Sequence, residues 1–269
     1  MRRLALAAVV ALAGCEARPQ DEIFIKGSDT MVGLLNLWAD SFERTDEARV
    51  VHSGGGSSAG IHAVLYGLVD LAASSRPMTR KERRAAARKG LEVYDIEVAR
   101  DGIVAIAHPD NPITALSQEQ LAQVLTGEAR QWSELGGAEG PIKVLNRNSS
   151  SGTRAFVRSR IMGGRDYTPR AKVLPSTRAI IQGVRADPNA LGYVGLGAAA
   201  GASVRALAIL TPEPIRATPT TIRSGNYPLT RTLHFYAVVR PGGPVQRFLD
   251  HVQGPEGQKA VDNLGFVPR

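Results

Sequence analysis

The sequence predicts an α/β protein of two lobes, and three observations support this prediction. Three successive apolar segments near the N-terminus each end in a small or hydroxyl-rich turn, and a helical pattern follows each of them. The middle of the chain repeats this order of strand and helix. The length of 269 residues is enough for one large domain or two of ordinary size. Alternating strands and helices indicate a parallel sheet.

Residues 1–15 form a leader that is not part of the fold. Two arginines precede an apolar segment, 4–12, that is too short to span a bilayer. The leader ends in Leu-Ala-Gly-Cys, which is similar to the lipobox of bacterial lipoproteins. Cys15 is the only cysteine, so we expect no internal disulfide and interpret it as the lipid attachment site, the alternative being an incidental cysteine after an ordinary secretory signal. With residues 16–21 as a tether, the protein is expected to be exported and anchored to a membrane, periplasmic or at the cell surface.

The charge of the chain favours an anionic ligand. The formal net charge is +8, and without the two leader arginines 31 basic residues stand against 25 acidic ones, a charge of +6. The densest basic run, 81–89, lies in an alanine-rich helical pattern without interleaved aromatic residues, so we interpret it as a solvated face. Because the protein is also expected to be exported, nucleic acid is excluded as the expected partner.

The three strand-and-helix units of the first lobe place three polar turns along one edge of a sheet. The predicted strands are 23–26, 50–51 and 71–73, and the predicted helices include 34–42, 61–68 and 81–89. The turns that follow the three strands are 27–30, 53–60 and 74–77. In parallel sheets ligands bind beyond the carboxyl ends of the strands, where these turns converge. Three turns that can bind an anion therefore predict an anion site at this edge.

The middle block forms the second lobe. An uninterrupted apolar run at 102–107 predicts a strand that leaves the first sheet, and Ser117 is expected to begin a helix. The later predicted elements are a strand at 142–145, helices at 154–162 and 180–184, a strand at 192–195, a loop-rich region at 198–230, a strand at 233–239 and a helix at 245–264 interrupted at Gly254-Pro255. The chain is thus expected to cross between lobes near 107 and return near 232. Lobe 1 is predicted as 22–107 with 232–269, and lobe 2 as 108–231.

The segment 146–156 carries the clearest chemical signal. It follows a short apolar strand and precedes a helix, so unpaired helix N–H groups and the positive end of the helix dipole point at one spot. Ser151, Gly152 and Thr153 would supply backbone and hydroxyl donors, and Arg147 a bidentate, permanently charged fork. This set of groups suits a tetrahedral oxyanion. The alternative is a solvated loop in which a serine or threonine only caps the helix.

The order of these segments resembles the phosphate-specific substrate-binding proteins of bacterial ABC importers, which have the type II periplasmic-binding-protein fold. The resemblance covers about residues 23–268, and its strongest signature is Arg147 followed by Ser151-Gly152-Thr153. The other matching segments are Gly27-Ser28-Asp29-Thr30, Gly56-Ser57-Ser58, Asp70-Leu71-Ala72-Ala73-Ser74-Ser75-Arg76, Asp101-Gly102-Ile103, Gly192-Tyr193-Val194-Gly195, Tyr227-Pro228-Leu229-Thr230-Arg231 and Pro255-Glu256-Gly257-Gln258. The resemblance implies two lobes that close over one dehydrated phosphate, and delivery to the permease subunits of an ABC transporter. It implies a monomeric binding protein without a cofactor and without enzyme activity.

The resemblance also implies a set of phosphate ligands. Carried over by position, they are Ser28, Asp29, Thr30, Ser57, Ser75, Arg147, Ser151, Gly152 and Thr153. Arg147 would be the only full positive charge in the site. Some members have an aspartate where this chain has Ser75, and that carboxylate accepts the proton of hydrogen phosphate and repels sulfate. Asp29 is a candidate replacement acceptor, the alternative being that it caps the following helix.

Other functions stay open at this point. The ligand could be another oxyanion, such as sulfate, molybdate or arsenate, or the protein could be a phosphate sensor that serves no transporter. The run Gly56-Ser57-Ser58-Ala59-Gly60 fits the G-x-S-x-G elbow of serine hydrolases, with Ser58 as nucleophile. Only one strand-helix unit precedes it, and none of the later histidines lies in an obvious loop after an acid. No cysteine pair and no His-x-x-x-His occurs, so no metal site is expected.

Overall fold

The structure is a computed structural model that describes residues 21–269. The leader, its Cys15 and tether residues 16–20 lie outside the described residues. Lobe 1 opens with β1 (Glu22–Gly27), α1 (Val32–Phe42), β2 (Arg49–Ser53), α2 (Ser57–Leu65), β3 (Leu71–Ser74), α3 (Arg80–Arg88) and β4 (Tyr94–Ala107). The middle of the chain contains β5 (Ala115–Ser117), α4 (Gln118–Thr126), a 3-10 helix (Trp132–Leu135), β6 (Lys143–Arg147), α5 (Gly152–Arg160), β7 (Lys172–Leu174), α6 (Thr177–Ala186), β8 (Ala190–Gly195) and α7 (Leu196–Ala199). The last part contains β9 (Arg205–Ala206), β10 (Ala208–Thr211), β11 (Glu213–Ile215), α8 (Pro219–Arg223), β12 (Thr230–Ala237), α9 (Gly243–Gln253) and α10 (Pro255–Asn263).

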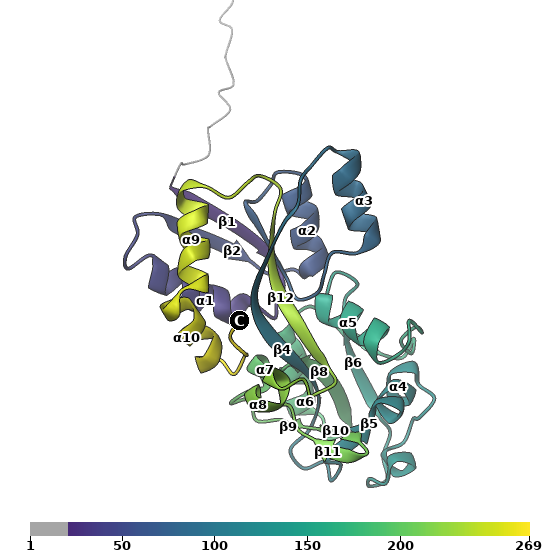
Figure 1. The fold of residues 1–269 in the computed structure, drawn as a ribbon. Helices are drawn as coiled ribbons and strands as arrows, with labels where there is room; N and C mark the ends of the chain where they lie inside the picture. The colour runs from purple at the N-terminus through teal and green to yellow at the C-terminus, as the bar shows by residue number, and fades with distance from the viewer. Residues whose placement is uncertain (1–20) are drawn as a thin grey trace, which may run out of the picture.

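The sheet of lobe 1 has the strand order β2-β1-β3-β12-β4. β1 pairs in parallel with both β2 and β3, which confirms the predicted parallel sheet. β12 enters between β3 and β4 and is antiparallel to both. Helices α1, α9 and α10 lie on one side of this sheet, and α2 and α3 lie on the other (Figure 1). α1 packs the predicted face of Leu34, Leu35, Trp38 and Phe42 into the core, because apolar side chains at this spacing share one side of a helix.

The long strand β4 belongs to both lobes. Its first part, from Tyr94 to Gly102, pairs with β12, whereas Ile103–Ala107 pairs with β8 of lobe 2. The sequence predicted only the end of this strand, since residues 94–97 alternate between exposed and half-buried positions instead of forming an apolar run. The sequence also placed 103–107 in lobe 1. These residues instead pair in the lobe 2 sheet, so the lobes are joined inside β4.

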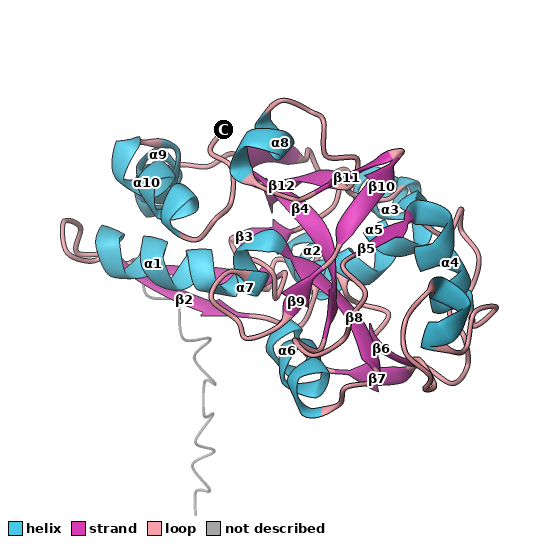
Figure 2. Ribbon diagram, turned by 90° about the horizontal axis from the view of Figure 1, so that it is seen from below, coloured by secondary structure: helices cyan, strands magenta, loops and turns pink. Residues whose placement is uncertain are grey.

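Lobe 2 continues the sheet in the order β4-β8-β6-β7, with a separate small sheet of β11-β10-β5. Figure 2 shows α6 beside β8 and β6, and α4 beside β5. Ser117 begins α4 as predicted, and its hydroxyl accepts the Gln120 N–H over 3.0 Å. Residues 198–230 were predicted only as loop-rich, and the structure shows that they contain the short elements β9, β10, β11 and α8. The terminal helical pattern is broken where predicted, with α9 ending at Gln253 and α10 beginning at Pro255.

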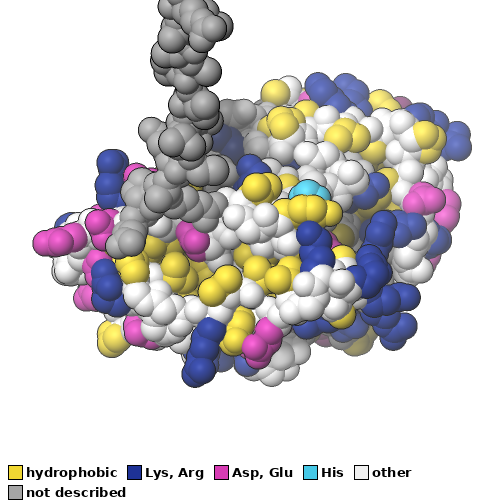
Figure 3. Space-filling model, turned by 90° about the horizontal axis from the view of Figure 1, so that it is seen from above, with side chains coloured by type: hydrophobic (Ala, Val, Ile, Leu, Met, Phe, Trp, Pro, Cys, Tyr) yellow, Lys and Arg dark blue, Asp and Glu magenta, His cyan; other side chains and the backbone are white. Residues whose placement is uncertain are grey.

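At the end of lobe 1 where the described chain begins, hydrophobic, basic and acidic side chains occupy different parts of the surface. Hydrophobic side chains lie in its centre, Lys and Arg gather along one side, and acidic groups gather towards the other (Figure 3). Within residues 21–269, no helix combines the length and the apolar character that crossing a bilayer requires.

An ion pair that joins α9 to the segment after α1 predicts a pH dependence of stability. Hydrogen bonding by Arg247, whose Nε lies 2.6 Å from Asp46 Oδ2, lowers the pKa of Asp46 from 3.8 to about 2. Because the unfolded chain regains the ordinary pKa, the pair stabilises the fold above about pH 4, and this contribution is lost as the pH falls through about 2. We expect the Arg247→Gln variant to lose less stability than the unchanged protein when the pH falls from about 4 to about 2. The effect is small because Arg247 is half exposed and water screens the pair.

Urea unfolding midpoints at about pH 6 and about pH 2 measure this effect. Arg49→Gln removes an equal charge from an exposed position on β2 and serves as the control. If Arg247→Gln and Arg49→Gln show the same pH dependence, the pair does not contribute.

Candidate functional site

Four turns from the two lobes converge on one region. Three of them follow β1, β2 and β3 in lobe 1, and the fourth follows β6 in lobe 2. The Gly56 N–H donates to the Gly27 carbonyl over 2.8 Å, which joins the first two turns. The Ser58 N–H donates to the Ser150 carbonyl over 3.0 Å, and the Ser150 hydroxyl donates to the Gly55 carbonyl over 2.6 Å. These last two contacts join the lobes, so turns predicted from separate parts of the sequence form one site.

Two serine hydroxyls and a glycine form the tightest part of this region. Ser57 Oγ and Ser75 Oγ lie 3.3 Å apart, and the Ser75 N–H donates to Ser57 Oγ over 3.1 Å. Both serines are fully buried. A Cβ added at Gly152 would lie 2.2 Å from Ser57 Oγ and 2.6 Å from Ser75 Oγ, which is closer than a side chain can approach. Glycine is therefore required for the first turn of α5 to reach these hydroxyls.

Backbone amides at the starts of α1, α2 and α5 have no protein partner. They belong to Asp29, Thr30, Ser57, Gly152 and Thr153, and within residues 21–269 none donates a hydrogen bond. All of these residues except Asp29 are buried. Buried amides without a partner are rare, because the loss of hydration is not compensated. Helix N-termini with free amides are a common site for anions.

Two threonines, one from each lobe, meet beside these amides. Thr30 Oγ1 and Thr153 Oγ1 lie 3.1 Å apart. Arg231 donates to both, from NH1 to Thr153 and from NH2 to Thr30, each over 3.0 Å. Because both oxygens accept from the guanidinium, their protons point elsewhere. One can bridge the two threonines, and the other is left to donate to a ligand.

Arg231 forms a buried ion pair that sequence analysis did not assign to the site. Its Nε and NH2 donate to Asp101 Oδ2 over 3.0 and 2.7 Å, and Asp101 Oδ1 accepts the Leu196 N–H over 3.1 Å. Burial raises the pKa of the Asp101 carboxyl and lowers the pKa of Arg231, and in each case the partner's charge opposes the change. The two residues occur in segments that matched the resemblance, but 130 positions separate them. The expectation that Arg147 is the only full positive charge in the site is therefore wrong.

Arg147, at the end of β6, joins the lobes through Asp29. Its NH2 lies 2.6 Å from Asp29 Oδ2 and 3.1 Å from the Pro175 carbonyl, and its NH1 donates to Thr177 Oγ1 over 3.2 Å. The side chain is 2% exposed. Within residues 21–269, Nε is a buried donor without a partner. Three of its five N–H groups are thus used, and the N–H of Nε and one N–H of NH1 are left for a ligand.

The strand that carries Arg147 is supported by a tyrosine. Asn146 Oδ1 accepts both the Arg147 backbone N–H, over 2.8 Å, and the hydroxyl of Tyr193 on β8. Burial raises the pKa of Tyr193 to about 12, so the phenol stays protonated and remains a donor at neutral pH.

The structure decides two alternatives about helix caps. Met31 is the N-cap of α1, and no side chain caps that helix, so Asp29 is not its cap. Ser151 does cap α5, since its Oγ accepts the Arg154 N–H over 3.2 Å. This contact uses the oxygen of Ser151 and leaves its proton free to donate. Capping and anion binding are therefore compatible at Ser151.

Ser58, the nucleophile of the alternative hydrolase reading, has an arginine as its neighbour. Ser58 Oγ accepts from Arg76 NH2 over 2.8 Å, and Arg76 also pairs with Glu82 over 2.7 Å. In the described part of the chain, no histidine forms a hydrogen bond with Ser58. The same residues contain no cluster of three His, Cys, Asp or Glu side chains that could hold a metal ion.

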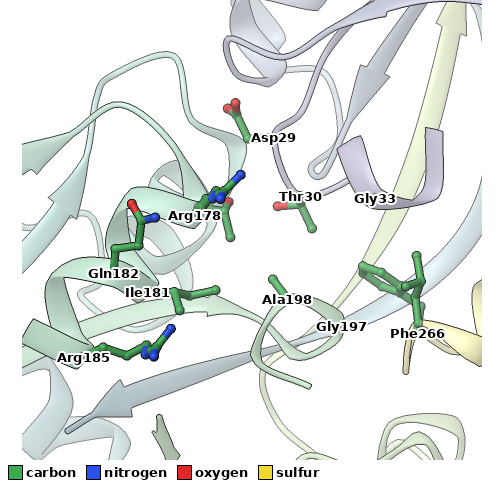
Figure 4. Close-up of a pocket in the computed structure, with 12 residues that line it drawn as sticks. Asp29, Thr30, Gly33, Arg178, Ile181, Gln182, Arg185, Gly197, Ala198 and Phe266 are labelled. Atoms are coloured by element: carbon green, nitrogen blue, oxygen red, sulfur yellow. The ribbon is translucent and has the colours of Figure 1, made fainter. Parts of the chain in front are cut away.

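A cavity of about 390 Å³ adjoins the site at Asp29, Thr30 and Thr177. Figure 4 shows Arg178, Gln182 and Arg185 of α6 along one side of it, and Phe266 on the other. The cavity does not include the predicted residues Ser57, Ser75, Ser151, Gly152 and Thr153. The cavity therefore lies beside the converging donors and does not enclose them.

The sequence is similar to a family model and to named proteins. A sequence model described as PBP superfamily domain matches residues 15–256. The chain is 28% identical to the phosphate-binding protein PstS of Pseudomonas aeruginosa over 263 residues, which covers 90% of this chain and 81% of that protein. It is 29% identical to the phosphate-binding protein PstS of Bacillus subtilis over 257 residues, covering 94% and 82%.

Solved structures show the same similarity. A putative phosphate ABC transporter substrate-binding protein from Clostridium perfringens, solved with bound phosphate, matches with a TM-score of 0.85 at 25% identity. The match covers 92% of this chain and 99% of that one. An ABC-type phosphate transport receptor from Vibrio cholerae matches with a TM-score of 0.73 at 26% identity, covering 92% and 100%.

The buried pair of Arg231 and Asp101 predicts a large effect on stability. We expect Arg231→Met to lower the free energy of unfolding by about 3–5 kcal/mol, because it leaves a buried carboxylate unpaired. The double variant Arg231→Met with Asp101→Leu removes both charges and should recover part of this loss. Urea unfolding followed by tryptophan fluorescence measures both, with Arg223→Met on exposed α8 as the control. A loss no larger than that of the control would contradict the prediction.

Proposed function

This chain belongs to the PBP superfamily, and from that premise we propose that it is an extracytoplasmic protein that captures inorganic phosphate between its lobes and delivers it to an ABC importer. The proposal is supported by relatives named phosphate-binding protein PstS, whose length the chain largely spans. It is also supported by the similarity to a phosphate-bound structure at a TM-score of 0.85. The geometry of the site supports the same ligand independently.

The observation that carries the proposal is the set of donors that both lobes direct at one place. Lobe 1 contributes free amides of Asp29, Thr30 and Ser57, and lobe 2 contributes those of Gly152 and Thr153. The hydroxyls of Ser57, Ser75, Ser151 and the threonine pair add to them, as does the free Nε of Arg147. Phosphate is strongly hydrated, and a buried site must replace its water shell with many directed donors. Ser28 supports the first turn through its N–H, which donates to the Ala73 carbonyl over 2.9 Å.

The side chains that would surround the phosphate carry almost no net charge. Arg147 is paired with Asp29, and Arg231 is paired with Asp101. The charge of a bound anion would therefore be balanced by N–H and O–H dipoles and by the N-terminal ends of three helices. Affinity in the micromolar range corresponds to about −8 kcal/mol, which several charge-assisted hydrogen bonds can supply after the cost of ordering.

Ligand binding is expected to stabilise the closed arrangement of the lobes. The contacts between Asp29 and Arg147, between Thr30 and Thr153, and between Ser58 and Ser150 each join one lobe to the other. An anion held by donors from both lobes makes all of its contacts only when the lobes are closed. A ligand shifts such an equilibrium by its difference in affinity for the two states.

We propose a binding protein and not an enzyme. Ser58 Oγ accepts a hydrogen bond from the positively charged Arg76. Within the described residues it has no hydrogen bond to a base that could take its proton. Ser75 in place of a carboxylate supports a second candidate, the binding of another oxyanion such as sulfate, molybdate or arsenate. A titration of the mature protein against phosphate, sulfate and arsenate tests the ligand class.

The cellular setting of the proposal rests on the leader and the relatives. We propose that Cys15 is acylated, that the protein is an exported monomer held at a membrane, and that permease subunits are its partners. A phosphate sensor without a transporter is the alternative. A permease gene beside the gene for this chain would support the importer.

Replacing Arg147 should weaken phosphate binding strongly. We expect Arg147→Ala to cost at least about 2 kcal/mol of binding free energy, because the anion loses a charged donor in a water-excluded site. Calorimetric titration with phosphate measures the loss. Arg178→Ala, an exposed arginine that lines the neighbouring cavity, is the matched control and should retain affinity. Near-native affinity of Arg147→Ala would refute the site assignment.

Replacing Asp29 should change selectivity. Its carboxylate accepts the proton of hydrogen phosphate in our hypothesis, and it repels sulfate, which has no proton at neutral pH. We expect Asp29→Asn to reduce the preference for phosphate over sulfate by about tenfold or more, a difference of about 1.4 kcal/mol or more. Calorimetry with both anions measures the ratio, and Asp166→Asn, an exposed aspartate of lobe 2, is the control. An unchanged ratio would rule out Asp29 as the acceptor.

A further inference from the structure

We propose that the end of lobe 1 opposite the anion site is a surface that adsorbs to anionic phospholipid bilayers. We call this surface the distal face. It consists of the exposed apolar side chains Tyr66, Leu68 and Val239 and the neighbouring cations Arg84, Arg88 and Lys89. The proposal concerns a different surface from the phosphate site and does not require that phosphate be the ligand.

The distal face lies at the opposite ends of the strands from the ligand turns. The turns follow the carboxyl ends of β1 and β3, whereas the segment before β3 lies beside the start of β1. There the Asp70 N–H donates to the Phe24 carbonyl over 2.9 Å. β12 is antiparallel to β3, so its last residue and Val239 beyond it reach this same end. A cavity of about 370 Å³ lined by Gly67, Val69, Val238 and Val239 joins the two segments.

The apolar side chains of the distal face are unusually exposed. Tyr66 is 57% exposed, Leu68 61% and Val239 77%, and these are three of the six large hydrophobic side chains exposed in the described residues. Tyr66 stacks on His62 with ring centroids 4.4 Å apart, and Lys89 Nζ lies 3.5 Å from the centre of the Tyr66 ring. A tyrosine beside a lysine is typical of the headgroup level of a membrane, where one end of the ring is apolar and the other is wet.

The basic helix α3 gives this end its positive charge. Arg84 and Arg88 lie in the later part of this helix and Lys89 directly after it, at the distal end, whereas Arg80 and Lys81 lie at its start, which follows the ligand-side turn after β3. Its single acid, Glu82, is held by Arg76 at 2.7 Å. Figure 3 shows Lys and Arg along one side of this end and acidic groups towards the other, so the α3 side would approach an anionic surface most closely. The solvated face expected from the sequence thus adjoins exposed apolar groups, a combination that suits a lipid surface.

The leader points to a bilayer as the occupant of this surface. β1 begins at Glu22, so six residues separate it from Cys15. The seven residue-to-residue steps from Cys15 to Glu22 span at most about 25 Å. If Cys15 carries the lipid, the end of lobe 1 where β1 begins must remain within that distance of the membrane. A basic and apolar protein surface that touches the bilayer adds to the attachment that a lipid anchor provides.

Vesicle binding by the chain without its leader tests the proposal. Residues 16–269 contain every described element of both lobes and lack the lipid site. We expect this protein to co-sediment with vesicles that contain phosphatidylglycerol and much less with vesicles of phosphatidylcholine alone, and we expect high salt to release it. Arg88→Glu with Lys89→Glu should weaken this binding by about tenfold or more. Tyr66→Ser with Val239→Ser should weaken it without changing its dependence on salt.

The matched control is Arg170→Glu with Lys172→Glu, which makes the same charge change at exposed positions of lobe 2 and should keep vesicle binding. Equal loss in this control would overturn the proposal by showing that only the net charge matters. So would equal binding to both vesicles, or self-association without vesicle binding. Calorimetry with phosphate on the same proteins separates the two hypotheses, since retained phosphate binding with no vesicle binding rejects the distal face alone.

Discussion

The rest of the site depends on one buried ion pair in the strands that connect the lobes. Arg231 on β12 and Asp101 on β4 face each other in the antiparallel register. Both charges have lost their hydration, and their mutual contact, with the hydrogen bonds to Leu196 and to the two threonines, makes this burial tolerable. The remaining guanidinium N–H groups then reach Thr30 of lobe 1 and Thr153 of lobe 2. The linking strands therefore set where the two halves of the site meet, and each lobe carries one of the two hydroxyls that they orient.

This arrangement explains why the site uses dipoles more than charge. Each arginine is already paired with a carboxylate, so a bound anion must be stabilised by amides and hydroxyls aimed at it. Such donors act over short distances, and they come from different lobes. In the proposed function, affinity is therefore coupled to closure, and closure requires close approach of the lobes. Gly152 meets that requirement, because any side chain there would collide with Ser57 and Ser75.

Local patterns in the sequence predicted most of the fold, and contacts between distant residues account for what they missed. Strands β1, β2 and β3 and helix α1 follow from apolar spacing within a few residues. The polar turns follow from glycine and hydroxyl residues beside them. The first half of β4 was missed because it is stabilised by pairing with β12, about 135 residues away, and lacks an apolar run of its own. The role of Arg231 depends on the same pairing, including a register shift between Leu233 and His234 that no local pattern reveals.

If Ser75 stands at the position of the carboxylate that the resemblance implies, another group must distinguish phosphate from sulfate. A hydroxyl at this position can accept the proton of hydrogen phosphate, but it can equally donate to sulfate, so it imposes no penalty on the wrong anion. A carboxylate, in contrast, repels an anion that has no proton to offer. Asp101 is occupied, since Arg231 and the Leu196 N–H take both of its oxygens. Asp29 has one oxygen bound to Arg147, while the other accepts only a long contact of 3.3 Å from the Gly55 N–H. Among the carboxylates that contact the site in the described chain, Asp29 therefore has the acceptor capacity that selectivity requires.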